Sequence, residues 1–398
     1  MKTNKKQILI FSHNLHGYSG HEYMYTKELL NNLTKNLKPI VVGRKDINEV
    51  IRKELNVIRV FSTIDYNQEQ SLPVKFFKLL EREIKWFYEF RDFLKKNKLY
   101  KGDIIFIHSF SIYNTWSWIY FSKYFAKRGV KFLLLFRYSE LLLPRLIRPL
   151  HRLICNLLPK ENDNIQYLTD SRNLTEEYSR FSEINLAPGP VMAKTHINEK
   201  RILTERKGEI CLSYLGAARS DKGFYLLPDL VDKILSSSKY KLKINIQASL
   251  PGTKYIDKKC GQAIEKLKLI SNRNNNLKLH LEQLTDEKYN DLLLTTDIML
   301  LPYTGVTYKV QTSGVLIESM ANGIPCIVPN NSWMEEELKK TKGGISCNVE
   351  SKKELYNALV DLIEDIDIFS KNAVLGSDNV RKEHGPSALA NFIENKIK

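Results

Sequence analysis

Short apolar segments alternate with helical patterns along the whole 398-residue chain, and this alternation restricts the fold more than any other feature. The first series has strand-like segments at residues 7–12, 39–42, 103–108, 130–136 and 165–169. The second series has them at residues 210–215, 243–247, 277–281, 298–302, 325–328 and 344–347. Strands that alternate with helices at this spacing predict parallel sheets with helices on both faces. The sequence therefore predicts an α/β protein with two doubly wound parallel-sheet domains that face a central cleft.

A proline-rich interruption separates the two series. Residues Ala187-Pro188-Gly189-Pro190 break the pattern, so the linker is placed there. We expect domains at residues 1–190 and 200–380, followed by a C-terminal helix at 381–398 that is a candidate for packing back toward the first domain. In such sheets ligands bind beyond the carboxyl ends of the strands, so loops at these ends are the candidate site.

The charge is strongly basic and unevenly placed. Residues 1–200 hold 33 Lys and Arg against 20 Asp and Glu, whereas residues 201–398 hold 28 against 25. A basic field attracts phosphates, nucleic acid or anionic lipid. The five cysteines are scattered without a C-x-x-C pair, which favours a reduced, cytoplasmic setting over a zinc or disulfide framework. The apolar runs are too short to cross a bilayer, and no nucleic-acid-binding motif is present.

One segment of the second series contains the start and stop signals of a helix, with polar residues at its start. Thr312, Ser313 and Gly314 precede an apolar helix that starts at Val315 and stops near Asn322. The first N–H groups of a helix and its positive dipole end can bind an anion. The alternative is a helix that is simply capped by the Ser313 hydroxyl.

A cationic loop follows the first strand of the same series. Arg219 and Lys222 lie in it, between residues 210–215 and a helix that starts near Gly223. Arginine offers a fork to phosphate oxygens and lysine a movable point charge. Each could also be only solvated, but together with the helix start at residue 313 they describe a cradle for a diphosphate.

These two segments resemble the family 4 retaining glycosyltransferases of the GT-B fold. The G-x5-K-G loop of that family is matched by Gly216, Lys222 and Gly223. Its later "llEAmaxGxPvv" segment is matched by residues 316–327, which include Glu318. The resemblance covers residues 205–340 well and the N-terminal half weakly, and it implies two Rossmann-like domains.

The resemblance also implies roles for individual residues. Arg219 and Lys222 would neutralise the donor diphosphate, and Glu318 would bind the ribose hydroxyls. The backbone around Thr312, Ser313, Gly314 and Val315 would hold phosphate or sugar, and Gln283 and Leu284 would line the base.

Two departures from the family pattern stand out. Val310 occupies the position of the first Glu of the E-x7-E motif, which leaves the reading of the sugar open. The arginine that usually follows the first glycine is replaced by Ala217, and Arg219 comes two residues later.

The first series offers weaker candidates. The loop that contains Gly20 resembles the glycine-rich N-terminal loop of the family, or is only a tight turn. His108 ends a strand and would face the donor sugar, although histidine is often a core residue. Arg137, Tyr138 and Glu140 follow another strand and are weak candidates for the acceptor side.

Two stretches of the first series are basic and amphipathic, at residues 74–98 and 141–158. Such helices can lie in a membrane interface with cations toward anionic lipid, or can be ordinary packed helices. The Asp365-Ile366-Asp367 triplet spells a metal motif but lies in an acidic helical stretch, so no metal and no cofactor is expected.

The predicted function is metal-independent, retaining transfer of a hexose-type sugar from a nucleotide-sugar. The acceptor would be a glycan or lipid-linked molecule in surface-polysaccharide synthesis, and the protein would be cytoplasmic or peripheral on the inner face of the membrane. Two alternatives stay open: a non-catalytic GT-B subunit that binds a glycan or nucleotide, and a sugar-nucleotide epimerase.

Overall fold

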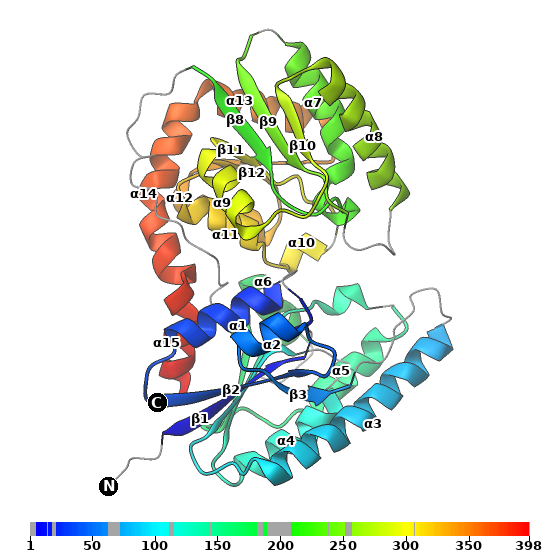
Figure 1. The fold of residues 1–398 in the computed structure, drawn as a ribbon, viewed down its shortest axis with the longest axis vertical. Helices are drawn as coiled ribbons and strands as arrows, with labels where there is room; N and C mark the ends of the chain where they lie inside the picture. The colour runs from blue at the N-terminus through cyan, green and yellow to red at the C-terminus, as the bar shows by residue number, and fades with distance from the viewer. Residues whose placement is uncertain are drawn as a thin grey trace. The chain divides into compact units, whose positions relative to one another are not determined.

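Two parallel β-sheets, each in its own domain, form the framework of the protein in a computed structural model (Figure 1). The first domain comprises Met1–Met192 and Pro386–Lys398, and the second comprises Ala193–Gly385. The structure describes residues 5–13, 15–17, 21–62, 72–110, 115–143, 145–180, 186–188, 208–237, 239–250, 257–305 and 307–397.

The first domain contains a seven-stranded sheet in the order β3-β2-β1-β4-β5-β6-β7, with every neighbouring pair parallel. Its strands are β1 (Lys6–Ser12), β2 (Leu37–Arg44), β3 (Ile58–Phe61), β4 (Ile104–Phe110), β5 (Lys131–Phe136), β6 (Ile165–Thr169) and β7 (Leu186–Pro188). Its helices are α1 (His21–Asn32), α2 (Glu49–Glu54), α3 (Leu72–Lys96), α4 (Thr115–Ala126), the 3-10 helix η2 (Glu140–Leu142), α5 (Arg148–Asn156), α6 (Arg172–Ser179) and α15 (Pro386–Ile397).

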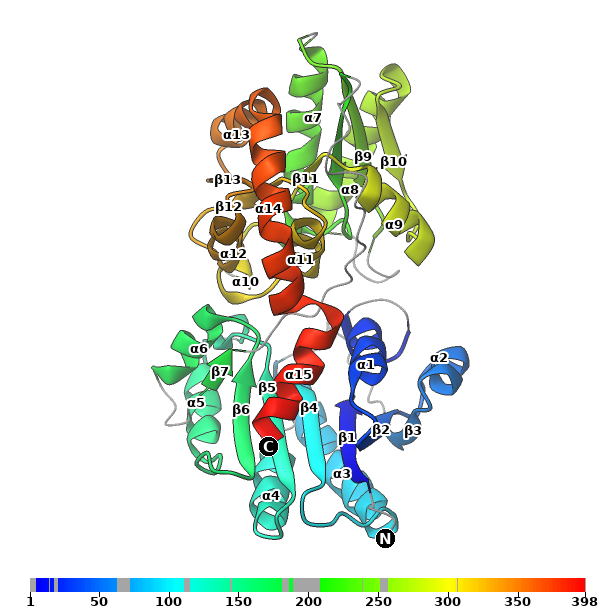
Figure 2. The same cartoon turned by 90° about the vertical axis from the view of Figure 1, so that its left-hand side faces the viewer.

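Alternate residues of this sheet build two cores, one on each face. Leu9 and Phe11 pack with α3, α4 and α5 on one face. Ile8 and Ile10 pack on the other face with α1 and α15, which lie in front of the strands in Figure 2 while α3 and α4 lie behind them. The strands are apolar at successive positions because both faces are covered.

The last helix completes the first domain. Leu389, Ala390 and Ile393 of α15 are buried with residues of β1, β4 and β5, and the Thr34 amide donates to the Glu394 carboxylate at 2.8 Å. The preceding helix α14 continues to His384, so the last helix starts at Pro386 rather than at residue 381.

The second domain contains a six-stranded parallel sheet in the order β10-β9-β8-β11-β12-β13. Its strands are β8 (Ile210–Tyr214), β9 (Leu242–Gln247), β10 (Leu277–His280), β11 (Ile298–Leu300), β12 (Cys326–Pro329) and β13 (Gly344–Cys347). Its helices are η4 (Ser220–Lys222), η5 (Phe224–Leu226), α7 (Leu227–Ser236), α8 (Lys258–Arg273), α9 (Asp286–Thr295), α10 (Thr307–Val310), α11 (Gly314–Ala321), α12 (Trp333–Thr341), α13 (Lys352–Glu364) and α14 (Ile366–His384).

The two doubly wound sheets confirm the predicted α/β class, and one local prediction is wrong. The linker was placed at residues 187–190, but Ala187 and Pro188 lie in β7, where they pair with Leu168 and Thr169 of β6. Proline is tolerated there because β7 is an edge strand. Residues 189 and 190 lie outside the described part of the chain. Among the described helices, none combines the length and the apolar character needed to span a bilayer.

Candidate functional site

The candidate donor site lies where the second sheet changes direction. From β8 the chain moves outward to β9 and β10, and from β11 it moves the other way to β12 and β13. Because β8 and β11 are parallel neighbours, the loops that follow them emerge side by side at the same edge. The Arg219 loop follows β8, and the segment that leads to α11 follows β11.

Two glycines shape the loop after β8. A Cβ at Gly216 would lie 3.3 Å from the Lys222 Nζ atom, so the missing side chain makes room for this ammonium group. Gly223 has φ +67°, and a Cβ there would lie 1.7 Å from the Pro302 carbonyl oxygen. Only glycine fits such a conformation beside a neighbouring backbone. The G-x5-K-G spacing is thus explained by the geometry of the loop.

The Lys222 ammonium group is placed among aromatic rings. Its Nζ atom lies 5.3 Å from the centre of the Tyr303 ring, and the Tyr308 ring lies 4.4 Å from that of Tyr303. Burial lowers the pKa of Lys222, whereas the charge of Glu318 raises it. The side chain is therefore a partly desolvated cation that gains from an anionic partner.

Arg219 is more exposed than Lys222 and is held by a near neighbour. Its Nε atom donates to the Asp221 carboxylate at 2.9 Å, in a two-pronged ion pair. The loop itself is bonded to the segment after β11: the Thr304 amide donates to the Asp221 carbonyl at 2.9 Å, and the Thr304 hydroxyl donates to the Ser220 carbonyl at 2.9 Å. These bonds fix both cationic residues relative to that segment.

Helix α11 starts at the same edge. Ser313 caps the helix, because its hydroxyl accepts from the Leu316 amide at 3.3 Å. Thr312 precedes the cap, and Gly314 and Val315 supply the first amides of the helix, which have no intrahelical acceptor. The helix is therefore capped by Ser313, as one of the two alternatives predicted. The cap leaves the Gly314 and Val315 amides available to an anion.

Glu318 lies on the second turn of α11 and is held by another helix. The Tyr289 hydroxyl of α9 donates to its Oε2 atom at 2.5 Å. Gln283 is exposed and Leu284 half-buried in the loop that precedes α9, the helix that carries Tyr289. Val310 is the last residue of α10 and is half-buried.

His108 of the first domain is fully buried in this structure. Its Nε2 atom lies 2.6 Å from the Ser12 hydroxyl and 3.2 Å from the Glu22 carboxylate. Burial, with a smaller contribution from the Arg137 charge, lowers the pKa of His108 to about 3, so the ring is neutral. The ring that was expected to face a sugar is thus enclosed by its own domain.

The other predicted residues of the first domain differ in exposure. Arg137 lies over the Tyr25 ring at 4.0 Å, with its Nε atom 3.5 Å from Asp170, while Tyr138 is exposed. Glu140 is buried and forms an ion pair with Arg152, so its carboxylate holds η2 against α5. Gly20 lies outside the described residues.

Acidic clusters that resemble metal sites are explained by other contacts. Glu337, Glu383 and His384 converge in the described part of the second domain, but the Lys340 ammonium group lies 2.7 Å from both carboxylates. Asp365 and Asp367 lie at the junction of α13 and α14 rather than after a strand.

Comparison with known proteins agrees with this geometry. Residues 196–375 match the family described as "Glycosyl transferases group 1". Sucrose-phosphate synthase of Thermosynechococcus elongatus has the same fold (14% identity, 98% of each chain, TM-score 0.68), as does a glycosyltransferase of Rickettsia africae (14%, 99% of this chain and 98% of the other, 0.69). HepE of Anabaena, solved with UDP and glucose, also shares it (10%, 99% of each chain, 0.65). No curated protein matches the chain in sequence.

The fold and the family match define the protein as a glycosyltransferase of the GT-B fold. The family match lies within the second domain, which is therefore a glycosyl transferases group 1 domain.

Three tyrosines of the candidate donor site, Tyr289, Tyr303 and Tyr308, were not identified as site residues from the sequence. Tyr303 directly follows the strand-like segment at residues 298–302, and that position was a signal that could have identified it. Tyr289 and Tyr308 lie on helices and carried no such signal, because their contacts depend on how α9 and α10 pack.

Proposed function

We propose that the protein transfers a sugar from a nucleotide-sugar to an acceptor with retention of the anomeric configuration, as a family 4 type enzyme. The observation that carries the proposal is the group formed by Lys222, Arg219 and the N-terminus of α11 at the edge where the second sheet reverses direction. Two cations and a helix amide end suit a diphosphate better than any uncharged ligand.

The proposed mechanism rests on the charge of the leaving group. As the bond between sugar and diphosphate breaks, negative charge grows on the phosphate oxygens. Lys222 and Arg219 stabilise this charge without a metal ion, and a well-placed donor of this kind contributes a few kcal/mol. Glu318, held by Tyr289, accepts hydrogen bonds from the ribose hydroxyls. Gln283 and Leu284 are proposed to line the base.

The acceptor is proposed to be a glycan or a lipid-linked molecule of surface-polysaccharide synthesis. We place the enzyme at the inner face of the cytoplasmic membrane, since the basic amphipathic stretches of the first domain suit that location. Arg137 and Tyr138 are proposed on the acceptor side, and nucleic acid is not a proposed partner.

A panel of nucleotide-sugars tests the reaction without knowledge of the acceptor. Each is incubated with the protein in dilute methanol, which replaces the acceptor alcohol, and the methyl glycoside is analysed by NMR. A product of retained configuration is expected; an inverted product overturns the proposed stereochemistry. Binding without turnover would identify the non-catalytic subunit, and an isomerised sugar-nucleotide without methanol would identify the epimerase.

Turnover by site variants and a matched control tests whether the two cationic residues act in the reaction. Lys222→Ala and Arg219→Ala are expected to lower turnover at least roughly tenfold, because each removes a stabilising charge. Lys353→Ala, at an exposed position of α13, serves as the control and is expected to leave the rate unchanged. Wild-type rates in both cationic variants would refute the proposed site.

A further inference from the structure

The helices α3, α4 and α5 cover one face of the first sheet, and all three also present apolar residues on their outer sides. Their inner sides fill the core with residues such as Phe90, Phe121 and Cys155. The exposed apolar residues of these helices and of the segment before α5 are Phe77, Leu80, Ile84, Tyr88, Trp116, Tyr120, Tyr124, Leu141, Leu142, Leu146, Leu150, Leu153 and Leu157. We name these thirteen residues the outer face.

The spacing of the outer face shows continuous stripes rather than scattered residues. On α4, Trp116, Tyr120 and Tyr124 recur every fourth residue, and the rings of Tyr120 and Tyr124 stack with their centres 6.1 Å apart. Leu150 and Leu153 lie on α5 and Leu146 in the turn that precedes it, and Leu146 and Leu153 are 87% and 59% exposed. Residues three or four apart share one side of a helix. An exposed apolar surface of this extent is unusual unless it binds something.

The charged residues of α4, α5 and their flanks are all basic. Residues 115–129 and 145–160, which contain α4 and α5 with their flanks, hold seven Lys and Arg and no Asp or Glu. Helix α3 has seven basic and four acidic residues. The surface therefore combines apolar stripes, aromatic rings and cations.

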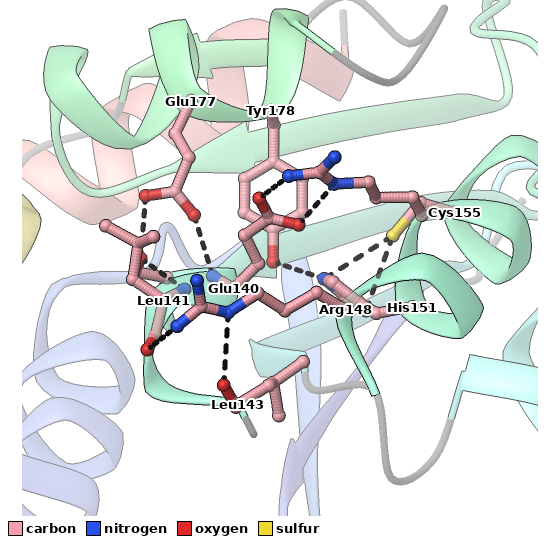
Figure 3. Close-up of polar contacts among 10 residues, drawn as sticks. Glu140, Leu141, Leu143, Arg148, His151, Cys155, Glu177 and Tyr178 are labelled. Carbon is pink, nitrogen blue, oxygen red and sulfur yellow. Dashed lines mark hydrogen bonds and ion pairs between the residues drawn. The ribbon is translucent and has the colours of Figure 1, made fainter. Parts of the chain in front are cut away.

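Two acidic residues next to α5, Glu140 and Glu177, are buried and form the polar contacts drawn in Figure 3. Glu177 accepts from the Ser139 hydroxyl at 2.6 Å and from the Glu140 amide at 2.7 Å, while Glu140 pairs with Arg152. Arg148 donates to the carbonyls of Leu141 and Leu143. This buried network fixes η2 against α5, so the exposed leucines are held outward by the fold.

We propose that the outer face is the surface through which the enzyme docks on an anionic lipid bilayer. Aromatic residues such as Trp116 favour the headgroup level, leucines enter the acyl boundary, and the cations face anionic headgroups. A second copy of the chain is a poor occupant, because a two-fold interface would set the basic residues of α4 and α5 against those of the other copy. The inference deepens the proposed location of the enzyme by naming the surface that contacts the membrane.

The test is sedimentation with vesicles of phosphatidylcholine, with and without 30% phosphatidylglycerol (about a third anionic lipid, to give a negative surface potential). Wild-type protein is expected to sediment with the anionic vesicles and to be released by salt. The double variant Leu146→Glu/Leu153→Glu is expected to bind at least tenfold more weakly. The control is Leu375→Glu on α14, because Leu375 is 69% exposed but belongs to the second domain. Its binding should equal that of the wild type.

A fluorescence experiment keeps the proposal testable if the double variant folds poorly. Trp116 is exposed, whereas Trp86, Trp118 and Trp333 are buried. Anionic vesicles should therefore shift the emission of the protein to the blue, and Trp116→Phe should abolish the shift while the protein still sediments. No vesicle binding by the wild type, or equal binding by the double variant, would overturn the docking surface.

The methanol assay separates this proposal from the proposed function. The double variant is expected to convert the nucleotide-sugar in solution at the wild-type rate, because the outer face lies in the first domain and Lys222 in the second. If the wild-type protein shows turnover but does not bind vesicles, the docking surface alone is refuted. Vesicle binding without turnover would refute the proposed function alone.

Discussion

The two domains share one architecture but differ in what they expose. Of the large hydrophobic residues found exposed in the described part of the chain, seventeen lie in the first domain and four in the second. At the carboxyl ends of the strands the contrast is reversed, since the first domain buries a neutral His108 and the second presents the cationic Arg219 and Lys222. The same sheet topology thus supports an apolar outer surface in one domain and a charged strand edge in the other.

The largest effect is expected from the second domain, at the backbone of the cationic loop. Gly223→Ala should lower the free energy of unfolding by about 3 kcal/mol or more, because the new Cβ would clash with the Pro302 carbonyl in a left-handed conformation. Gly208→Ala is the matched control. Gly208 also has a positive φ, of +76°, but its added Cβ would have no atom within 4 Å, so a loss of about 1 kcal/mol in the free energy of unfolding is expected. Denaturant unfolding measures both, and equal losses would show that the clash is relieved.

Acid is expected to weaken the first domain more than the second. Burial lowers the pKa of His13 and His151 to about 4 and that of His108 to about 3. The unfolded chain binds protons near pH 6.5 while the folded domain does not, so stability falls as the pH drops below 6.5, by about 2 kcal/mol per histidine at pH 5.

A buried glutamate of the same domain opposes this loss. Burial raises the pKa of Glu83 to about 8, so the folded domain binds this proton more readily and gains stability as the pH falls from 8 toward 4.5. The net loss below pH 6.5 is therefore smaller than the sum over the histidines. His151→Gln should reduce it by about 2 kcal/mol in denaturant unfolding, whereas His16→Gln, at an exposed position, should not.

Alkaline conditions are expected to act on the second domain. Since burial lowers the pKa of Lys222, its ammonium group is lost at a lower pH than that of an ordinary lysine, and kcat/KM for the nucleotide-sugar should fall there by about tenfold. Lys222→Arg keeps its charge and should shift this fall to higher pH. An unchanged alkaline limb would show that another group titrates.

The smallest effect is expected from the bond between Tyr289 and Glu318. Tyr289→Phe should raise the KM for the donor about threefold, because Glu318 loses the group that orients it. For a donor that carries 2′-deoxyribose, the KM should differ less between the wild type and Tyr289→Phe. This comparison separates the loss of ribose recognition from a general structural loss. Tyr356→Phe, a tyrosine of α13, is the control and should have the wild-type KM.

The sequence predicted the sheets and the G-x5-K-G loop because their signals are local. Strand-like runs and a strand–loop–helix order can be identified without knowledge of the packing. The burial of His108 could not be predicted, since it depends on Ser12, which lies 96 residues earlier. The contact of Tyr289 with Glu318 spans 29 residues and depends on the packing of two helices. The exposed aromatic stripe of α4 was hidden among the buried aromatic residues Trp118 and Phe121.

The return of α15 to the first domain has a consequence for synthesis on the ribosome. The core around Ile8 and Leu133 lacks Leu389 and Ile393 until the whole second domain has been translated. Part of one face of the first sheet therefore stays uncovered until the last helix emerges from the ribosome. A nascent chain stalled before residue 386 should be captured by chaperones through that uncovered face, because the helix that covers it has not been made.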